Sequence, residues 1–239
     1  MNKGGNGGRP CNSFAQENAA VWYILLKRGE LQVPAGDLQA RIKEAADAGG
    51  AAYFGVADLS PAVAFIREEN GHIAASFPMA VAVGIAVPKT LVLALAEPDA
   101  DPGILAAYDR YIYHVCSPLL EKIALKIAGV IERAGYRALP VPASQRVPGK
   151  NLCGFFSHKL AANLAGLGWI GKSSLLLTPQ DGPRVRWCTV LTDAPLNAGS
   201  SLQKDCGKCN RCAEACPAGA IKGRAFDPRE PRSMRIEVE

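Results

Sequence analysis

This sequence of 239 residues lacks three features, and each absence narrows the class of protein. No apolar stretch reaches the roughly 20 residues of a membrane-spanning helix, because charged residues interrupt the longest runs. Residues 1–10 are rich in glycine and lack the apolar segment of a secretory signal. No internal repeat is visible. We therefore expect a cytoplasmic protein without a membrane partner, and we expect residues 1–12 to form a disordered tail.

Cysteine is the residue type that carries most information. Four of the eight cysteines follow the spacing C-x2-C-x2-C-x3-C-P, which is typical of bacterial ferredoxin-type [4Fe–4S] sites. The short gaps wrap the chain so that thiolates meet the corners of one cluster, and Gly207 lets backbone amides turn toward the sulfurs. The predicted iron–sulfur ligands are Cys206, Cys209, Cys212 and Cys216.

Two other uses of these cysteines fit less well. A structural zinc site usually joins two C-x2-C pairs across a dozen or more residues. A disulfide cluster is typical of a short secreted chain. The number of clusters, one or two, stays open, because the fourth cysteine of such a run can ligate a second cluster. No second run follows before Glu239, so the module is truncated, incomplete or completed by a distant cysteine. The four other cysteines are expected to be ordinary buried residues: Cys11, Cys116, Cys153 and Cys188.

Helical and strand patterns alternate along the rest of the chain. This predicts an α+β fold, a mixed α/β sandwich, with an α/β cofactor-binding body at 13–197 and a small ferredoxin-like module at 198–239. The expected helices are 14–28, one that follows 34–37 and ends at 47, one capped by Ser60, 88–96, 104–134 with a break at Pro118, and 155–167. The expected strands are 52–57, 78–87, 136–141, 174–178 and 185–192.

Residues 166–173 match the phosphate-loop pattern G-x4-G-K-[ST], and Asp193 follows as in a Walker B strand. A phosphate loop needs a strand before its glycines and a helix after them. The predicted order here is the reverse, which argues against nucleotide binding. The segment is either a packed helix C-cap or a turn that approaches a ligand closely.

Basic residues are concentrated in the second half of the body. Between 137 and 186 seven Lys and Arg face one acid, Asp181. They form either a solvated surface or a pocket for a phosphate-bearing cofactor or nucleic acid. Of the three histidines, His158 is the preferred cofactor or substrate contact, whereas His72 is expected to be exposed and His114 to be partly buried.

Two blocks, 157–177 (SHKLAANLAGLGWIGKSSLLL) and 190–196 (VLTDAPL), precede the cysteine run. In this order they resemble the epoxyqueuosine reductase family and its short relatives over 138–221. The resemblance implies a nitroreductase-like body adapted to cobalamin and fed with electrons by iron–sulfur clusters, as in corrinoid reductive dehalogenases. It also implies these cofactor-binding residues: Ser157, His158, Lys159, Gly168, Trp169, Gly171 and Lys172.

The chain departs from that family at its proton donor. Tyr113 and His114 match the family's motif, but Ile112 occupies the place of the acid. Epoxide reduction on a tRNA base is therefore disfavoured, whereas reductive electron transfer is not. Tyr111 and Tyr113 are either core aromatic residues or alternative proton donors.

These observations predict an oxidoreductase that passes electrons from [4Fe–4S] to a corrinoid-type cofactor. Its expected partners are an electron donor such as a ferredoxin or flavodoxin, and a small-molecule or tRNA substrate. The alternative is a non-catalytic electron-transfer or accessory iron–sulfur protein that has lost the acid. A nucleotide-binding protein is the third hypothesis.

Overall fold

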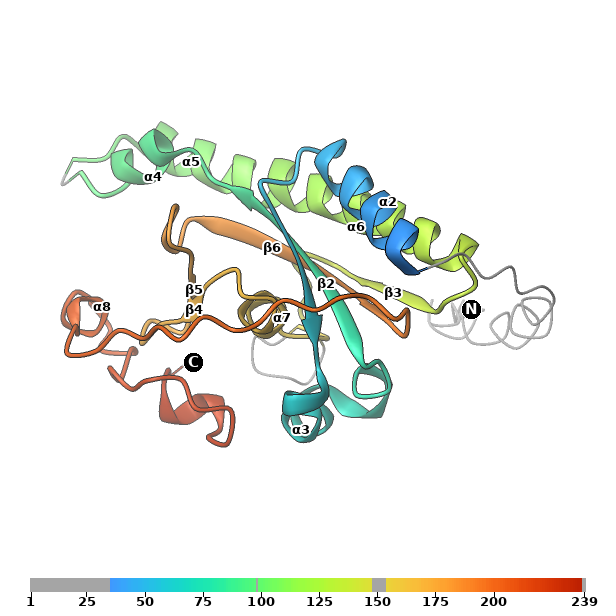
Figure 1. The fold of residues 1–239 in the computed structure, drawn as a ribbon. Coiled ribbons are helices and arrows are strands. Elements are labelled where there is room, and N and C mark those ends of the chain that lie inside the picture. The colour runs from blue at the N-terminus through green and yellow to red at the C-terminus, as the bar shows by residue number, and fades with distance from the viewer. Residues whose placement is uncertain (1–34, 98, 148–153, 238–239) are drawn as a thin grey trace, which may run out of the picture.

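The structure, a computed structural model, describes residues 35–97, 99–147 and 154–237. The predicted helix at 14–28, the tail at 1–12, and Cys11 and Cys153 lie outside the described residues. The body is built on one antiparallel sheet with strand order β1-β2-β6-β3 (Figure 1). Its strands are β1 Tyr53–Asp58, β2 Met79–Ala86, β3 Ala138–Val141 and β6 Val185–Thr192.

The sheet explains the apolar runs in the sequence. Strand β2 is a central strand, paired with β1 on one side and β6 on the other. Apolar clusters cover both faces of the sheet, which is why its apolar run is largely buried. A Cβ on Gly84 would lie 2.7 Å from the Trp187 ring of β6, so only glycine fits there. Pro140 lies in β3, which is an edge strand, where a missing N–H is tolerated.

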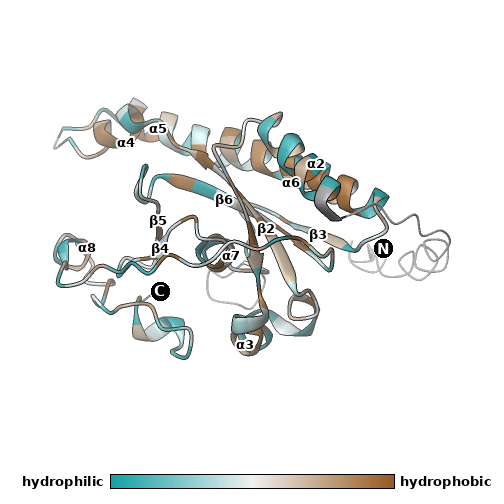
Figure 2. Cartoon of the chain, viewed as in Figure 1, coloured by the Kyte–Doolittle hydropathy of each residue, from teal (hydrophilic) through white to brown (hydrophobic). Residues whose placement is uncertain are grey.

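Helices cover both faces of the sheet. Helix α6 (Ser117–Arg133) and helix α2 (Ala35–Asp47) pack on one face, where Ile123, Ile127 and Ile131 are buried against β2 and β6. Helix α7 (His158–Leu164) packs on the opposite face, and α3 (Val63–Ala74) contributes Ile66 to the same apolar cluster. The hydropathy colouring shows brown stripes along α6 and the central strands (Figure 2). The predicted mixed helix-and-sheet body is thus confirmed.

The long predicted helix is interrupted just before Pro118, by a π-helical turn rather than by a kink at the proline itself. Helix α5 (Pro102–Tyr111) runs into a π-helical turn, η2 (Ile112–Cys116), which leads directly into α6. Pro118 has no N–H for the helical ladder, so a wider turn forms before it. The Ile112 carbonyl accepts the backbone N–H of Ser117 and also the Ser117 hydroxyl, the latter at 2.9 Å. A short α4 (Lys89–Ala94) precedes α5.

Three local predictions were wrong in detail. Ser60 does not cap a helix: it is the first residue of a 3-10 turn, η1 (Ser60–Ala62), and its N–H donates to Asp58 Oδ1 at 2.8 Å. The predicted helix at 155–167 is limited to α7. The predicted strand at 174–178 is limited to the short β5 (Leu176–Leu177). It pairs with β4 (Trp169–Ile170) in a hairpin that the sequence did not predict.

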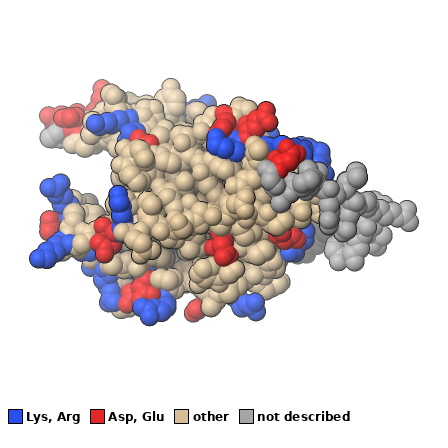
Figure 3. Space-filling model, in the orientation of Figure 1, with Lys and Arg blue, Asp and Glu red and all other residues tan. Residues whose placement is uncertain are grey.

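From Asn197 onward the chain, here called the C-terminal segment (197–237), has little regular structure. It contains a single-turn helix, α8 (Arg211–Glu214), a 3-10 turn, η3 (Arg232–Met234), and a bridge between Ile221 and Ile236. Lys and Arg side chains gather over it at the left of the molecule, whereas the middle of this face is mostly uncharged (Figure 3). Within the described residues, no helix combines the length and apolarity needed to cross a membrane.

Candidate functional site: a basic cavity beside a cysteine loop

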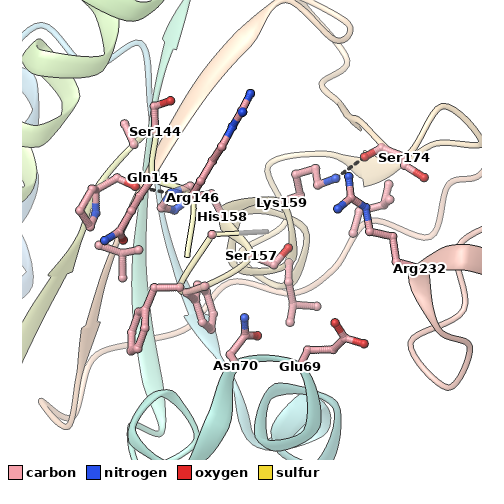
Figure 4. Close-up of a pocket in the computed structure, with 18 of the residues that line it drawn as sticks. Glu69, Asn70, Ser144, Gln145, Arg146, Ser157, His158, Lys159, Ser174 and Arg232 are labelled. Carbon is pink, nitrogen blue, oxygen red and sulfur yellow. Dashed lines mark hydrogen bonds between the residues drawn. The ribbon is translucent and has the colours of Figure 1, made fainter. Parts of the chain in front are cut away.

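A cavity of about 420 Å³ opens between α7, β6, the end of α3 and the C-terminal segment (Figure 4). Its volume falls in the lower part of the range of small-molecule sites, about 300–1,000 Å³. Aromatic rings form much of its wall, and they come from segments far apart in sequence: Phe65, Tyr113, Phe155, Phe156 and Phe226. Of the predicted cofactor residues, Ser157, His158 and Lys159 line it.

The lining of the cavity is strongly basic. One acid, Glu69, stands against five cations, which are Arg146, Lys159, Arg186, Arg232 and Arg235. Arg235 is 5% exposed and donates to two carbonyls of its own segment, so its charge has a structural use. The excess of positive charge suits an anionic ligand.

Arg186 is a cation of the cavity that the protein leaves partly without hydrogen-bond partners. It donates to the Ser117 hydroxyl at 3.2 Å, and its guanidinium lies 5.2 Å from the centre of the Tyr113 ring. Its Nε is buried without a hydrogen-bond partner, and among the described residues no carboxylate pairs with it. A part-buried cation with an unbonded Nε and no counter-ion is unfavourable, so an anion in the cavity would stabilise this arrangement.

Ser174 is the second unsatisfied group of the cavity. It has a φ of 59°, the left-handed region that a serine rarely adopts, in the turn between β4 and β5. Its side chain is 8% exposed, and its hydroxyl has no hydrogen-bond partner. Lys159 donates to its carbonyl, as the dashed line in Figure 4 marks. Backbone strain with an unpaired buried hydroxyl is typical of a binding site.

His158 is held by the protein itself. Its Nε2 lies 2.9 Å from the Pro142 carbonyl, which can only accept, so Nε2 carries the proton and Nδ1 accepts from the Thr189 hydroxyl at 2.8 Å. Burial lowers the pKa of His158 to about 4, and the nearby Arg186 charge also lowers it, against the opposite effect of the Pro142 bond. The imidazole is therefore neutral at pH 7, and both its nitrogens are occupied.

The two tyrosines of the family-like motif are not core residues. Tyr111 is 51% and Tyr113 is 49% exposed, so the interpretation as core aromatics was wrong. The π-helical turn gives adjacent residues opposite environments: Ile112 is buried in the body and Tyr113 lines the cavity. Ile112 cannot donate a proton, whereas the Tyr113 hydroxyl group belongs to a side chain that borders the ligand space.

The predicted cofactor residues of the glycine turn (166–173) lie against the C-terminal segment. A Cβ on Gly166 would lie 2.4 Å from the Ser200 carbonyl oxygen, and one on Gly171 would lie 3.3 Å from Cys206 Sγ. Lys172 Nζ donates to Asn210 Oδ1 at 2.8 Å. Gly168, Trp169, Gly171 and Lys172 do not line the cavity, although Ile170 and Ser174 beside them do.

The four cysteines of the predicted cluster lie in the cysteine loop (204–216) as free thiols. Their donor chemistry fits an iron–sulfur cluster: Gly207 has φ 49°, and backbone N–H groups, that of Ile221 first, hold the pKa of the Cys216 thiol below its ordinary value. Within the described part of the chain, no three His, Cys, Asp or Glu side chains are arranged as a metal site. Cluster binding therefore rests on the donor set, and many metal sites close only around their metal.

The other two described cysteines are ordinary buried thiols, as predicted. Cys188 is fully buried, its thiol donates to the Val141 carbonyl at 3.0 Å, and burial raises its pKa to about 12. Cys116 is 7% exposed, and burial raises its pKa. Neither touches the cysteine loop by any contact recorded among the described residues.

The seven basic residues of 137–186 have separate uses. Three line the cavity, Arg137 is paired with Asp193, and Arg184 with Asp181. The carboxylate of the Walker-B-like Asp193 thus accepts a hydrogen bond from Arg137 Nε at 2.6 Å. Helix α7 precedes the glycine turn, which contains β4, and strand β5 follows it, so the predicted reversal of the phosphate-loop order is confirmed.

No family model matches this chain. Among curated proteins it is 34% identical to the epoxyqueuosine reductase of Listeria monocytogenes over 145 residues, which are 60% of this chain and 36% of that protein. It is 34% identical to that of Vibrio cholerae over 127 residues, 53% of this chain and 31% of that protein. The chain therefore spans well under two thirds of the length of these curated relatives.

Solved structures extend the similarity to reductive dehalogenases. One, NpRdhA solved with 3-bromo-4-hydroxybenzoic acid, has a TM-score of 0.55 and 26% identity, over 75% of this chain and 25% of that chain. Another, linked to B12-dependent dehalogenation, has a TM-score of 0.58 and 23% identity, over 84% of this chain and 28% of that chain.

A third structure is the epoxyqueuosine reductase of Bacillus subtilis with its catalytic aspartate loop swung out of the active site. It has a TM-score of 0.54 and 17% identity, over 78% of this chain and 53% of that chain. At identities below 25%, this match and the B12-linked one show the fold alone. The predicted resemblance to epoxyqueuosine reductases and to corrinoid reductive dehalogenases is confirmed.

Proposed function

We propose that this chain is a cytoplasmic iron–sulfur oxidoreductase that passes electrons from the cysteine loop to a corrinoid in the body. One observation carries the proposal: the cavity is walled both by the body and by the C-terminal segment that bears the cysteines. Phe226, Arg232 and Arg235 belong to that segment and line the same space as Lys159 and the rest of α7.

The four cysteines of the loop ligate a [4Fe–4S] cluster, and 198–239 is a ferredoxin-like module whose cluster number, one or two, depends on further ligands. The body, 13–197, is nitroreductase-like and holds the corrinoid. Epoxyqueuosine reductases and reductive dehalogenases use both cofactors, which supports the assignment. When bound, the cluster supplies single electrons and the corrinoid supplies the metal centre that they reduce.

The residues of the cavity divide the remaining tasks. Lys159 and Arg186 provide positive charge, Ser174 provides an unpaired hydroxyl, and Ser157 lies at the rim beside α7. His158 shapes the wall as a neutral ring, because both of its nitrogens are bonded within the protein. A whole corrinoid is much larger than a drug-sized ligand, so the described cavity accommodates part of it or the substrate against it.

Tyr113 is the proton donor of the proposed reaction. It replaces the acid that Ile112 cannot supply, it borders the cavity, and the Arg186 guanidinium lies over its ring. A positioned phenol hydroxyl can act as a general acid if it reaches the reacting atom.

The substrate is a small anion with an aromatic or other apolar part. The unpaired Arg186 and the aromatic wall support this, as does NpRdhA, a 26% identical neighbour solved with 3-bromo-4-hydroxybenzoic acid. A tRNA substrate has weaker support, from an epoxyqueuosine reductase solved with a modified tRNA stem loop at 18% identity and a TM-score of 0.50. The electron donor is a ferredoxin or flavodoxin that docks near the basic C-terminal segment.

The second candidate is an accessory electron-transfer protein. The buried, apolar Ile112 at the acid's place favours it. In that case the cluster assembles, but the body binds no corrinoid and reduces no substrate.

Anaerobic reconstitution with iron and sulfide, followed by titration with hydroxocobalamin, tests the proposal. We expect visible absorption from the cluster and a shift of the corrinoid spectrum. Arg186→Gln should weaken corrinoid or anion binding about tenfold, because it removes a part-buried charge of the cavity, whereas the control Arg133→Gln on α6 should not. A colourless, iron-free protein would overturn the redox assignment, and iron without corrinoid binding would leave the accessory role.

A further inference from the structure

We propose that the glycine turn is a latch that holds the cysteine loop in place, with Gly171 and Lys172 as its positioning residues. This inference deepens the proposed function and rests on it, because the loop is taken to carry the cluster. It gives a role to the G-x4-G-K-S motif, which has the composition of a phosphate loop but the wrong flanking elements.

The glycine turn runs side by side with residues 199–210 of the C-terminal segment. At one end Gly199 and Ser200 lie against Ala165 and Gly166, where an added Cβ would come within 2.5 Å of backbone oxygen from either side. Further along, Lys204 lies 5.9 Å from the centre of the Trp169 ring.

The contact continues through the predicted ligands. Gly171 is buried against Cys206, and Lys172 reaches Asn210. Asn210 lies between Cys209 and Cys212, so the bond from Lys172 fixes the part of the loop that joins two ligands.

The glycines of the motif are explained by this packing without any phosphate. A Cβ on Gly168 would lie 2.3 Å from the Leu177 carbonyl oxygen, which is a collision with backbone of the β4–β5 hairpin. A Cβ on Gly171 would lie 2.7 Å from Leu177 Cδ1 as well as 3.3 Å from Cys206 Sγ. The hairpin backs the turn, so a larger residue at 171 would push the cysteine loop outward.

Lys172 adds charge to the latch. Asn210 is neutral, and among the described residues no carboxylate pairs with Lys172. An ammonium beside a cluster held by four thiolates favours the more negative, reduced form, and so makes the reduction potential less negative.

The latch also joins the cysteine loop to the cavity. Ile170 and Ser174 line the cavity, while Gly171 and Lys172, between them, touch the loop. One turn of five residues, 170–174, therefore contacts both proposed redox sites, and Ser174 is the strained residue of that turn.

The test compares Lys172→Met, Asn210→Ala and the double variant in the full chain after anaerobic reconstitution. Two quantities are measured: the rate of cluster loss to a chelator and the midpoint potential. We expect each single variant to lose the cluster about fivefold faster. The double variant should lose it no faster than either single variant, because both remove the same bond. The midpoint potential should become more negative with Lys172→Met and stay near the wild-type value with Asn210→Ala.

Two controls separate position from charge and packing. Lys208 is an exposed residue of the same loop, and its ammonium does not bond to the glycine turn. Lys208→Met therefore removes a charge but no latch contact, and its rate of cluster loss should equal that of wild type. Gly171→Ala should accelerate cluster loss, whereas Gly129→Ala should not, because its Cβ would meet only the flexible end of Arg133.

The outcomes distinguish the two proposals. If wild type holds a cluster and Lys172→Met loses it at the wild-type rate, the latch is wrong and the proposed function stands. If wild type binds no iron, the proposed function fails. The latch is then judged in the apo protein: Lys172→Met should increase amide exchange within 204–216, and unchanged exchange would overturn it.

Discussion

The body and the C-terminal segment are ordered by different means. In the body, two apolar clusters fill the two faces of the sheet, with side chains such as Leu120, Ile127 and Leu191 fully buried. In the C-terminal segment, as described over 197–237, Arg235 alone is buried. Hydrophobic burial therefore specifies the body, whereas turns, a few hydrogen bonds and the glycine turn position the segment. With almost no core of its own, the C-terminal segment would depend on the proposed cluster for its order, whereas the body would not.

The largest effect should come from a predicted ligand. Cys209→Ser should abolish cluster assembly, because a serine hydroxyl is a poor replacement for a thiolate ligand. Iron content and visible absorption after anaerobic reconstitution measure this loss. The unfolding midpoint of the body, followed by far-ultraviolet circular dichroism, should stay unchanged. A normal iron content in this variant would contradict the ligand set, and a collapsed body would contradict the independence of the two regions.

A core truncation should have the opposite pattern. Ile127→Ala should lower the free energy of unfolding by about 2–5 kcal/mol, because it leaves a cavity between α6 and the sheet. Leu125→Ala is the matched control on the same helix: Leu125 is 67% exposed, and its truncation should cost less than about 0.5 kcal/mol. Urea unfolding measures both. Equal losses from the two variants would show that α6 does not pack as described.

The smallest of the three effects is the pH dependence that His158 imposes on the body. Its pKa is lowered to about 4 from the ordinary 6.5, so the unfolded chain binds its proton first on acidification. The stabilisation is complete above pH 6.5 and is lost as the pH falls from 6.5 to 4, by at most about 3 kcal/mol. Urea unfolding at pH 7 and pH 5 should show a smaller loss for His158→Gln than for wild type. His72→Gln, at an exposed position, should leave the loss unchanged.

The sequence was sufficient where one physical signal dominates a segment. The unbroken apolar run of β2 identified a strand covered on both faces, and helix α7 followed by glycines excluded a phosphate loop. The buried state of Cys116 and Cys188 was expected because a free cysteine outside a ligand motif usually behaves as a small apolar residue.

The sequence was insufficient where several segments combine. The cavity draws its cations from α7, β6, the loop after β3 and the C-terminal segment, and no local pattern indicates that Arg186 and Arg232 line the same space. Strands of two residues, β4 and β5, are too short to show periodicity. The resemblance grouped Ser157 with Lys172, but the structure assigns the first to the cavity and the second to the cysteine loop.

The π-helical turn at Ile112–Cys116 sets the phase between two helices. Removing one residue from it would allow α5 and α6 to join as a single regular helix. That change would rotate everything before the deletion by about 100° around the helix axis, the angle that one α-helical residue spans. Tyr113 would turn away from the ligand space and Ile112 would leave the core. The one extra residue of the π-helical turn thus decides which side chain lines the cavity. Insertions and deletions in this turn should therefore alter the proposed reaction more than most substitutions would.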